Sequence, residues 1–234
     1  MQNLEIYNEK NSAVLDAYER LMAYIHFASE KEQIRSLSVC SCRPGVGKTT
    51  TAINLAIAMA YSGKKTLLVD ADTRKPGSFK RLYMDTMPGF TDIIEDGIRL
   101  QDAVNSSNIR NLFYLSCGKK SKNPIELLCS SEFDKFNEEV KEKYEFVVFD
   151  TPSLTTVIDG TLVAAKTDAV ILIAQIGLTN LDSLNRAVEQ LENANAKLIG
   201  VVLNRVKKRD YKKYVESYNY FKRFDKEIKK KGLE

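Results

Sequence analysis

One segment of the chain combines two glycines, a lysine and hydroxyl side chains in the spacing that phosphate groups require. It consists of Cys42-Arg43-Pro44-Gly45-Val46-Gly47-Lys48-Thr49 and lies between an apolar run and a helical pattern. Glycines let the backbone curl so that successive N–H groups point at phosphate oxygens, and the following helix adds its partial positive charge. Lys48 would supply a full positive charge, and the Thr49 hydroxyl can bind Mg²⁺. Because Cys42 stands where the usual pattern has its first glycine, a glycine-rich turn without a ligand is the alternative.

Three carboxylates follow two further apolar runs. Asp70 and Asp72 come directly after one run, and Asp150 follows the other. The carboxyl ends of parallel strands meet at one edge of a sheet, which is also the edge where a phosphate loop lies. A strand-end aspartate often only caps a turn or a helix. Three of them after a phosphate loop instead predict a Mg²⁺ site, because the metal offsets the repulsion between carboxylates and phosphates.

Short apolar runs alternate with longer helical patterns along the chain. The strand candidates are Ser36–Ser41, Thr66–Val69, Leu112–Leu115, Phe146–Phe149, Ala169–Ala174 and Leu198–Leu203. The helix candidates are residues 11–28, Thr49–Tyr61, Ser131–Lys143 and Asn180–Asn193, and the turn-rich segment Thr73–Asn111 is expected to carry small helices. Continuous apolar runs are typical of strands buried on both faces of a parallel sheet. The alternation predicts a single α/β domain with a mostly parallel central sheet flanked by helices.

The composition is that of a globular protein. Of the 234 residues, 44% are hydrophobic and 28% are charged, which excludes a disordered chain, a collagen-like fibre and a disulfide-stapled mini-protein. We expect neither a membrane helix, which needs about 18 or more apolar residues, nor a secretory signal in the polar N-terminus. The four cysteines lack metal-ligand spacing and His26 is the single histidine, so we expect reduced, mostly buried thiols in a cytoplasmic protein.

The C-terminal segment differs in charge from the rest of the chain. From Lys207 onward it holds eleven Lys and Arg residues and five Asp and Glu residues, a local charge of +6, whereas the whole chain carries +4. Such a tail could contact anionic lipid, nucleic acid or an acidic partner, or it could be a solvated helix face. It also contains Tyr211, Tyr214, Tyr218 and Tyr220, four of the eleven tyrosines. Three of these tyrosines have helical spacing, so packing is one explanation for the cluster.

Together these segments resemble the bacterial tyrosine kinases of capsule and exopolysaccharide synthesis, which are similar in fold to the partition and septum-site ATPases. The likeness runs from about residue 13 to 206 and rests on the phosphate loop, Val69–Pro76, Phe149–Pro152 and Gly200–Arg205. Its most specific element is Asp-x-Asp-x-Arg-Lys-Pro at positions 70–76. The ATPases usually carry a lysine where this chain has Arg43, and the kinases tolerate a residue other than glycine at Cys42. Both positions therefore favour the kinases.

The resemblance implies a P-loop NTPase fold with ATP and Mg²⁺ as cofactors. The catalytic residues would be Lys48, Asp70 and Asp72; the nucleotide would bind Gly45, Val46, Gly47, Lys48, Thr49, Thr50 and Asn204; and the metal would bind Thr49, Asp72 and Asp150. Asp70 or Asp72 would orient or deprotonate the acceptor tyrosine while the other supports the metal, and the sequence does not divide these two roles. Asn204 would contact the adenine edge, with a turn residue as the alternative.

The resemblance also bears on the two ends of the chain. A C-terminal tyrosine cluster in this family receives phosphate from neighbouring molecules, so Tyr211, Tyr214, Tyr218 and Tyr220 are expected phosphoacceptors. In the N-terminal helix the family has Glu-x-x-Arg-x-x-Arg, which joins subunits into rings. At those positions this chain has Asp16, Glu19 and Met22, so both basic residues are lost and we expect ring assembly through this contact to be weak.

We therefore expect an ATP- and Mg²⁺-dependent protein-tyrosine kinase that phosphorylates its own tail and regulates capsule or exopolysaccharide synthesis. Its parts would be an N-terminal helical segment (1–35), a P-loop core (36–206) and a basic tail (207–234). The expected partners are a membrane-anchored activator or polysaccharide co-polymerase, which would recruit the cytoplasmic kinase to the membrane, a second copy in trans, and protein substrates of sugar-nucleotide metabolism. No nucleic acid is expected. The alternatives are a partition- or septum-site-type ATPase and a non-catalytic nucleotide-binding regulatory subunit.

Overall fold

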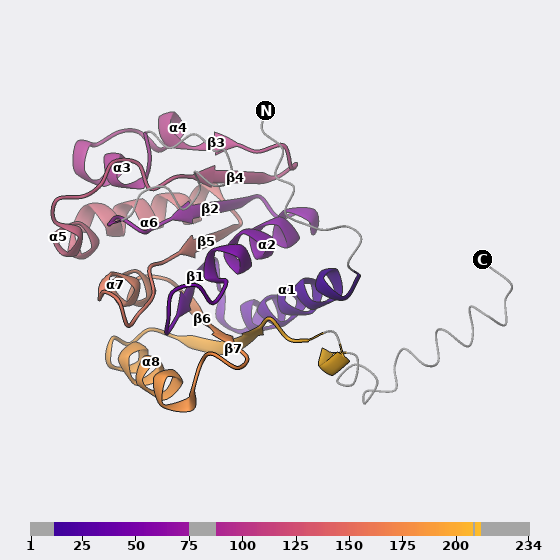
Figure 1. Cartoon of the computed structure of the whole chain (residues 1–234). Coiled ribbons are helices and arrows are strands. Elements are labelled where there is room, and N and C mark those ends of the chain that lie inside the picture. The colour runs from indigo at the N-terminus through magenta and orange to yellow at the C-terminus, as the bar shows by residue number, and fades with distance from the viewer. Residues whose placement is uncertain (1–11, 75–87, 208, 212–234) are drawn as a thin grey trace, which may run out of the picture. The chain divides into compact units, whose positions relative to one another are not determined.

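A seven-stranded sheet lies at the centre of the computed structural model, which describes residues 12–74, 88–207 and 209–211 (Figure 1). The strands are β1 (Ser36–Ser41), β2 (Thr66–Asp70), β3 (Asn105–Ser106), β4 (Leu112–Leu115), β5 (Phe146–Asp150), β6 (Ala169–Gln175) and β7 (Leu198–Asn204). Their order across the sheet is β3-β4-β2-β5-β1-β6-β7, and every pair is parallel except β3 with β4. The predicted α/β fold with a mostly parallel sheet is confirmed.

Eight helices are present in the described residues. They are α1 (Ser12–Glu32), α2 (Lys48–Tyr61), α3 (Phe90–Asp96), α4 (Leu100–Ala103), α5 (Pro124–Cys129), α6 (Ser131–Lys143), α7 (Asp159–Ala165) and α8 (Leu181–Asn193). Local chemistry sets several of these starts: the Ser130 hydroxyl accepts from the Phe133 N–H at α6, and the Asn180 side chain accepts from the Ser183 N–H at α8. The turn-rich segment after Thr73 does carry small helices, namely α3 and α4.

Alternate residues of the strands face two different layers of helices. On one face, Val39, Leu68 and Ile171 pack with apolar residues of α1 and α2. On the other face, Val69 and Phe149 pack against α3 and α6, while Leu172 packs against residues of α7 and α8. Because both faces are covered, the central strands are buried at nearly every position, which accounts for their continuous apolar sequences.

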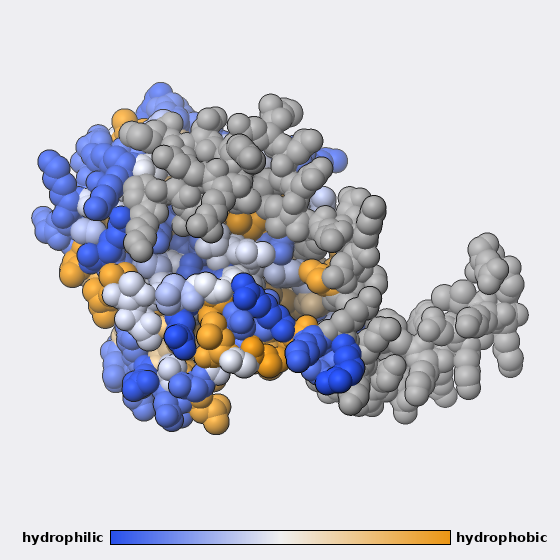
Figure 2. Space-filling view, in the orientation of Figure 1, coloured by the Kyte–Doolittle hydropathy of each residue, from blue (hydrophilic) through white to orange (hydrophobic). Residues whose placement is uncertain are grey.

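Several large apolar side chains of β7 and α8 are exposed at the surface. Figure 2 shows hydrophobic residues scattered among hydrophilic ones on this side of the molecule. Val201 and Leu203 of β7 and Leu181 of α8 are among the exposed large apolar side chains. As single exposed side chains among polar ones they are ordinary for a folded protein.

The state of the cysteines and the nature of the helices bear on two of the sequence-based expectations. All four cysteines are free thiols; Cys40, Cys42 and Cys117 are buried and Cys129 is exposed. Among the described residues, no helix is both long enough and apolar enough to cross a bilayer.

The chain divides into two units between Asn204 and Arg205. The second unit contains the basic tail, of which Lys208 and residues 212–234 lie outside the described residues.

Candidate active site

The glycine-rich segment forms a tightly curled loop between β1 and the first turn of α2. Gly45 and Gly47 have φ angles of +78° and +93°, in the left-handed region that favours glycine. A β-carbon at position 47 would lie 2.1 Å from the Asn204 side-chain nitrogen. That nitrogen donates a 2.7 Å hydrogen bond to the Val46 carbonyl. Asn204 therefore supports the loop from the end of β7, and Gly47 is required by both backbone angle and space.

Cys42, the departure from the usual pattern, points into the protein rather than into the loop. Its side chain is fully buried in an apolar cluster with Leu154, Ala164 and Val170. Burial raises the pKa of this thiol above its ordinary value. A side chain at this position therefore fills the core beneath the loop, which explains how the chain accommodates a residue larger than glycine there.

The amino end of α2 is available to an anion. Gly47 precedes the helix and has no side chain with which to cap it. Lys48, Thr49 and Thr50 form the first turn, and the Thr49 and Thr50 side chains are half-buried and exposed, respectively. The first N–H groups of a helix have no partner within the helix, so this end favours a negatively charged ligand.

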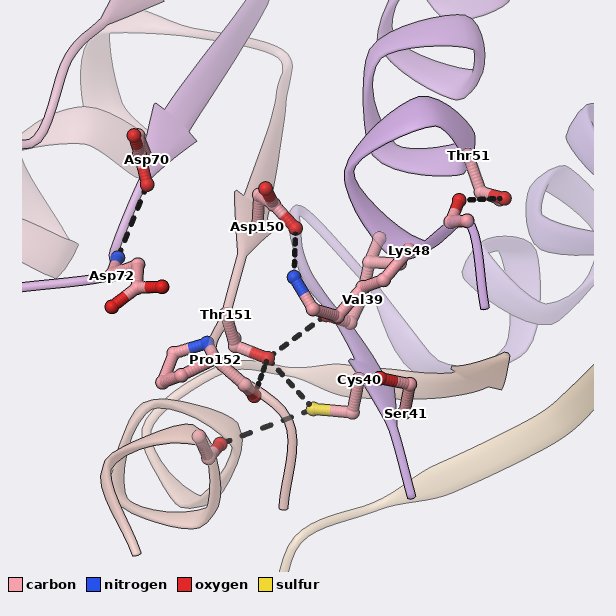
Figure 3. A network of polar contacts seen from close by, with 12 residues as sticks. Val39, Cys40, Ser41, Lys48, Thr51, Asp70, Asp72, Asp150, Thr151 and Pro152 are labelled. Carbon is pink, nitrogen blue, oxygen red and sulfur yellow. Dashed lines mark hydrogen bonds and ion pairs between the residues drawn. The ribbon is translucent and has the colours of Figure 1, made fainter. Parts of the chain in front are cut away.

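Lys48 is held by a buried carboxylate across the site. Its Nζ lies 2.5 Å from Oδ1 of Asp150, whose side chain is 1% exposed (Figure 3). Thr151, the next residue, donates from Oγ1 to the Val39 carbonyl at 2.9 Å and so fixes the end of β5 against β1. The two predicted site residues are thus in direct contact, and the pairing offsets the cost of burying Asp150.

Asp70 lies beside this pair and has no ion-pair partner among the described residues. In the parallel β2–β5 ladder Asp70 is opposite Asp150. Its Oδ1 accepts a 3.1 Å hydrogen bond from the Asp72 N–H, and its buried Oδ2 has no hydrogen-bond partner among the described residues. Burial, and then the negative charge of Asp150, raises the pKa of Asp70 well above its ordinary value. Asp72 is half-buried and lies at the same edge.

The carboxylates alone do not form a metal cage. Among the described residues, no three His, Cys, Asp or Glu side chains gather closely enough to hold a metal ion. Mg²⁺ commonly takes one or two carboxylates together with substrate phosphates and water. The unpartnered oxygen of Asp70 and the oxygen donors of Thr49, Asp72 and Asp150 around an open helix end fit that kind of site.

Two other thiols lie close to these carboxylates. Burial raises the pKa of Cys40 to about 11, and its sulfur lies 3.4 Å from the Thr151 hydroxyl oxygen. Cys117 donates to the Asp72 carbonyl at 3.2 Å, and its pKa is raised first by burial and then by the charge of Asp70. With raised pKa values these thiols stay protonated at neutral pH, so they act as structural groups rather than nucleophiles.

An arginine–aspartate pair beside Asp72 was missed by the sequence reasoning. Arg74 donates from Nε and Nη2 to the two carboxylate oxygens of Asp159 at 2.8 and 3.0 Å. Arg74 was visible within the Asp-x-Asp-x-Arg segment, but Asp159, the first residue of α7, had no local signal. The hydroxyl oxygen of Thr73, the residue before Arg74, is buried and has no partner among the described residues.

The two ends of the chain bear differently on the expectations. In α1, Asp16 accepts a 2.9 Å hydrogen bond from Arg20, Glu19 is exposed, and Met22 is half-buried against the core. In the tail, Tyr211 is half-buried and lies in a helical turn, and its backbone N–H donates to the Lys207 carbonyl. The other expected phosphoacceptors, Tyr214, Tyr218 and Tyr220, lie outside the described residues.

Comparison with known proteins identifies the class to which this fold and loop belong. The family model described as the CobQ/CobB/MinD/ParA nucleotide binding domain matches residues 37–228. The septum site-determining protein MinD of Pyrococcus horikoshii, solved with Mg-ADP, has a TM-score of 0.62 and 22% identity, covering 76% of this chain and 76% of that one. At that identity the likeness demonstrates a shared fold.

Two further proteins are more similar. The tyrosine-protein kinase YwqD of Bacillus subtilis is 33% identical over 213 residues, which cover 91% of this chain and 90% of that protein. The crystal structure of the chimerical protein CapA2B2 has a TM-score of 0.81 and 32% identity, covering 89% of this chain and 93% of that one. The chain therefore belongs to the CobQ/CobB/MinD/ParA nucleotide-binding family and, within it, to the bacterial tyrosine kinases.

Proposed function

We propose that this chain is an ATP- and Mg²⁺-dependent protein-tyrosine kinase that phosphorylates its own C-terminal tyrosines and regulates capsule or exopolysaccharide synthesis. The observation that carries the proposal is the arrangement at the carboxyl edge of three adjacent strands. Lys48 follows β1 and pairs with Asp150 of β5, while Asp70 of β2, next to β5, keeps an oxygen that has no partner in the described part of the chain. A phosphate-binding lysine and a free acceptor oxygen are what phosphoryl transfer to a hydroxyl needs.

Nucleotide binding would change the partner of Lys48. The loop from Gly45 to Thr50 would surround the phosphates with backbone N–H groups, and Asn204, beside Gly47, would contact the adenine. The Lys48 ammonium would move from Asp150 to the β- and γ-phosphate oxygens, where it stabilises the charge that develops during transfer. Asp150 would then be left to bind the metal, which replaces its lost positive partner.

Thr49, Asp72 and Asp150 would hold Mg²⁺ together with the nucleotide phosphates. When bound there, Mg²⁺ would neutralise part of the phosphate charge. All three residues carry oxygen donors, the type of ligand that this ion prefers.

In the transfer step the tyrosine oxygen would form a bond to the γ-phosphorus as the bond from that phosphorus to the bridging oxygen of ADP breaks. The hydroxyl proton would pass to the carboxylate of Asp70 or Asp72. A tyrosine hydroxyl has an ordinary pKa near about 10, so a neighbouring carboxylate that accepts its proton assists the attack. Both carboxylates lie at the same strand end and are joined by the Asp72 N–H to Asp70 bond, so both remain candidates for this role.

The proposed setting of the kinase follows from its resemblance to the bacterial tyrosine kinases. Tyr211, Tyr214, Tyr218 and Tyr220 would accept phosphate in trans from a second copy. Further partners would be a membrane-anchored activator or polysaccharide co-polymerase, which recruits the kinase from the cytoplasm, and protein substrates of sugar-nucleotide metabolism. The functional division would follow the N-terminal helical segment (1–35), the core (36–206) and the tail (207–234).

The test is incubation of the concentrated chain with ATP and Mg²⁺, followed by mass spectrometry of tail peptides. We expect phosphotyrosine on the tail, and we expect none when Mg²⁺ is removed with EDTA. ATP hydrolysis without any phosphotyrosine, even with an activator segment added, would contradict the kinase proposal and favour a partition-type ATPase.

A further inference from the structure

The Arg74–Asp159 pair combines an exposed cation with a completely buried anion. The Asp159 side chain is 0% exposed, whereas that of Arg74 is 39% exposed. The two hydrogen bonds, at 2.8 and 3.0 Å, are a two-pronged contact that fixes the plane and the direction of the guanidinium. A buried carboxylate is costly to maintain unless its partner is well placed, so Asp159 holds Arg74 in a defined position.

The Arg99–Asp102 pair has the same two-pronged geometry as the Arg74–Asp159 pair but is exposed. Arg99 also donates from Nε and Nη2 to both oxygens of an aspartate, Asp102, at 2.7 and 3.1 Å. In that pair the two side chains are 72% and 45% exposed. Exposed pairs of this type contribute little to stability and fix no other element. The Arg74 pair differs because its acidic member lies in the protein interior, at the start of α7.

Asp159 leaves part of the Arg74 guanidinium available to a ligand. The guanidinium has five N–H donors, and the bonds to Asp159 use two of them. The hydrogen bonds from Arg74 to Asp159, and more weakly the nearby charge of Asp72, raise the pKa of Arg74. Arg74 is therefore a permanent cation beside one of the expected site carboxylates, and its remaining donors have no partner among the described residues, so they can bind an anion.

The strand order relates the segment that holds Arg74 to the phosphate loop. Along the carboxyl edge, β1 with the phosphate loop is followed by β5 with Asp150 and then by β2 with Asp70. Asp72 and Arg74 follow the end of β2, which β5 with Asp150 separates from β1 and the phosphate loop. An acceptor must approach the terminal phosphate from outside the loop, so we take the end of β2, with Asp72 and Arg74, as the acceptor side.

We propose that Asp159 is a positioning residue that directs the free N–H groups of Arg74 toward the phosphoryl group on the acceptor side of the site. The proposal rests on the proposed phosphoryl transfer. Its ligand chemistry is a phosphoryl oxyanion, which is present both in the γ-phosphate before transfer and in the phosphotyrosine after it. Arginine suits either form, because its planar fork binds phosphate oxygens in pairs.

The test measures binding to the full chain in the presence of Mg²⁺ and compares Asp159→Asn with the unmodified protein. One arm compares ADP with the β,γ-imido analogue of ATP, and the other compares tyrosine and phosphotyrosine forms of one tail peptide with ADP bound. We expect Asp159→Asn to weaken one phosphoryl-bearing ligand about tenfold, as expected for a lost charge-assisted contact, while ADP and the unphosphorylated peptide change less than about twofold. The arm that responds identifies the source of the phosphoryl group.

The matched controls are Asp102→Asn, which removes the same charge from the exposed pair, and Arg74→Gln alone and combined with Asp159→Asn. If Asp159 acts through Arg74, the double variant binds no more weakly than Arg74→Gln. Equal loss for ADP and its analogue, no loss in either arm, or the same loss in Asp102→Asn would overturn the proposal. If Arg74→Gln does not fold, Arg74→Lys replaces it in the cycle. These readouts need no turnover, so a chain that binds as expected but forms no phosphotyrosine would refute the kinase and not the role of Asp159.

Discussion

Asp70 and Asp150 lie opposite each other at the final position of two adjacent parallel strands, yet they have different electrostatic surroundings. Asp150 is paired with Lys48 at 2.5 Å, whereas Asp70 accepts one backbone hydrogen bond and keeps a buried oxygen without a partner among the described residues. Two like charges this deep in a protein repel each other strongly. After burial, the negative charge of Asp150 is therefore the main cause that holds the pKa of Asp70 well above its ordinary value.

Replacing Asp70 with Asn should stabilise the nucleotide-free protein at neutral pH. Burial, followed by the charge of Asp150, raises the pKa of Asp70 above the ordinary value of 3.8 that it has in the unfolded chain. Between these two pKa values the folded state binds more protons than the unfolded state, so the free energy of unfolding falls as pH rises through this range. Asparagine keeps the oxygen that accepts from Asp72 and removes this penalty.

The check is the Tm of both proteins from acidic to neutral pH. The Tm advantage of Asp70→Asn should be greatest near neutrality and should vanish toward the ordinary pKa of Asp70. Asp102→Asn, at an exposed position, should show no such trend. A variant that is less stable at every pH would mean that the Asp70 carboxylate is stabilised by a contact that the nucleotide-free protein supplies.

Replacing Lys48 with Met should abolish phosphoryl transfer. It removes the one full positive charge at the end of the loop while keeping the bulk of the side chain. We expect ATP turnover and phosphotyrosine to fall by at least about 10²-fold, a typical effect of removing a positioned charge that stabilises a transition state. Because the buried Asp150 also loses its partner, the variant should be less stable by about 3–5 kcal/mol, so activity is measured well below its Tm.

Lys143→Met is the matched control for this experiment. Lys143 also pairs with a carboxylate, that of Glu139 at 2.6 Å, but on the exposed face of α6. Its replacement should leave turnover and Tm nearly unchanged. Near-normal turnover in folded Lys48→Met would mean that the glycine-rich segment does not bind the phosphates that react.

Converting Tyr211, Tyr214, Tyr218 and Tyr220 to Phe should remove most autophosphorylation. The change preserves the aromatic rings and deletes the hydroxyls, so it separates a role as acceptor from a role in packing. We expect a folded protein with intact ATP binding and little phosphotyrosine, measured by mass spectrometry and nucleotide titration. Heavy phosphorylation of the quadruple variant would place the acceptors elsewhere.

The unmodified chain should be monomeric or weakly associated in solution. Asp16 and Glu19 put two acids where the family has one acid and an arginine, and Met22 replaces the second arginine. Glu19 is exposed, and like charges hinder association. Because the tail must reach a neighbouring molecule, autophosphorylation should rise steeply with enzyme concentration. Light scattering is the direct measurement, and a stable ring at low micromolar concentration would contradict the expectation.

Glu19→Arg with Met22→Arg should promote oligomers and raise basal activity. The structure separates the two changes: Glu19 is exposed, whereas Met22 is half-buried against the core. An arginine at position 22 must lay its aliphatic part along the core surface and extend its charge outward. Glu19→Arg alone is therefore the control that changes charge without disturbing packing.

Most of the sheet could be predicted because its strands are buried on both faces and so read as apolar runs. The prediction of Thr66–Val69 and Phe146–Phe149 stopped one residue early, since Asp70 and Asp150 extend the ladder despite their charge. The two-residue strand β3, Asn105–Ser106, is polar and sits at the sheet edge. Its pairing with β4 comes from tertiary position and leaves no periodic signal.

The site was predictable where its residues are close in sequence to a strand end. The parallel sheet brings such ends together, so the meeting of Lys48 with Asp150 could be expected from topology. The contact of Arg74 with Asp159 could not, because Asp159 lies at the start of a seven-residue helix that no apolar pattern marked. Which carboxylate pairs with which cation depends on side-chain directions, and these are set by packing.

The crowding of Gly47 by Asn204 limits how this loop can change under mutation. Trimming position 204 to alanine would clear the space that a β-carbon at position 47 needs, but the +93° φ angle of Gly47 would still disfavour any other residue. The two positions are therefore unequal in tolerance: a library randomised at both should recover several residues at 204 but glycine alone at 47. A substitution at position 47 therefore cannot be compensated by a single change at position 204, and only reversion to glycine restores the loop.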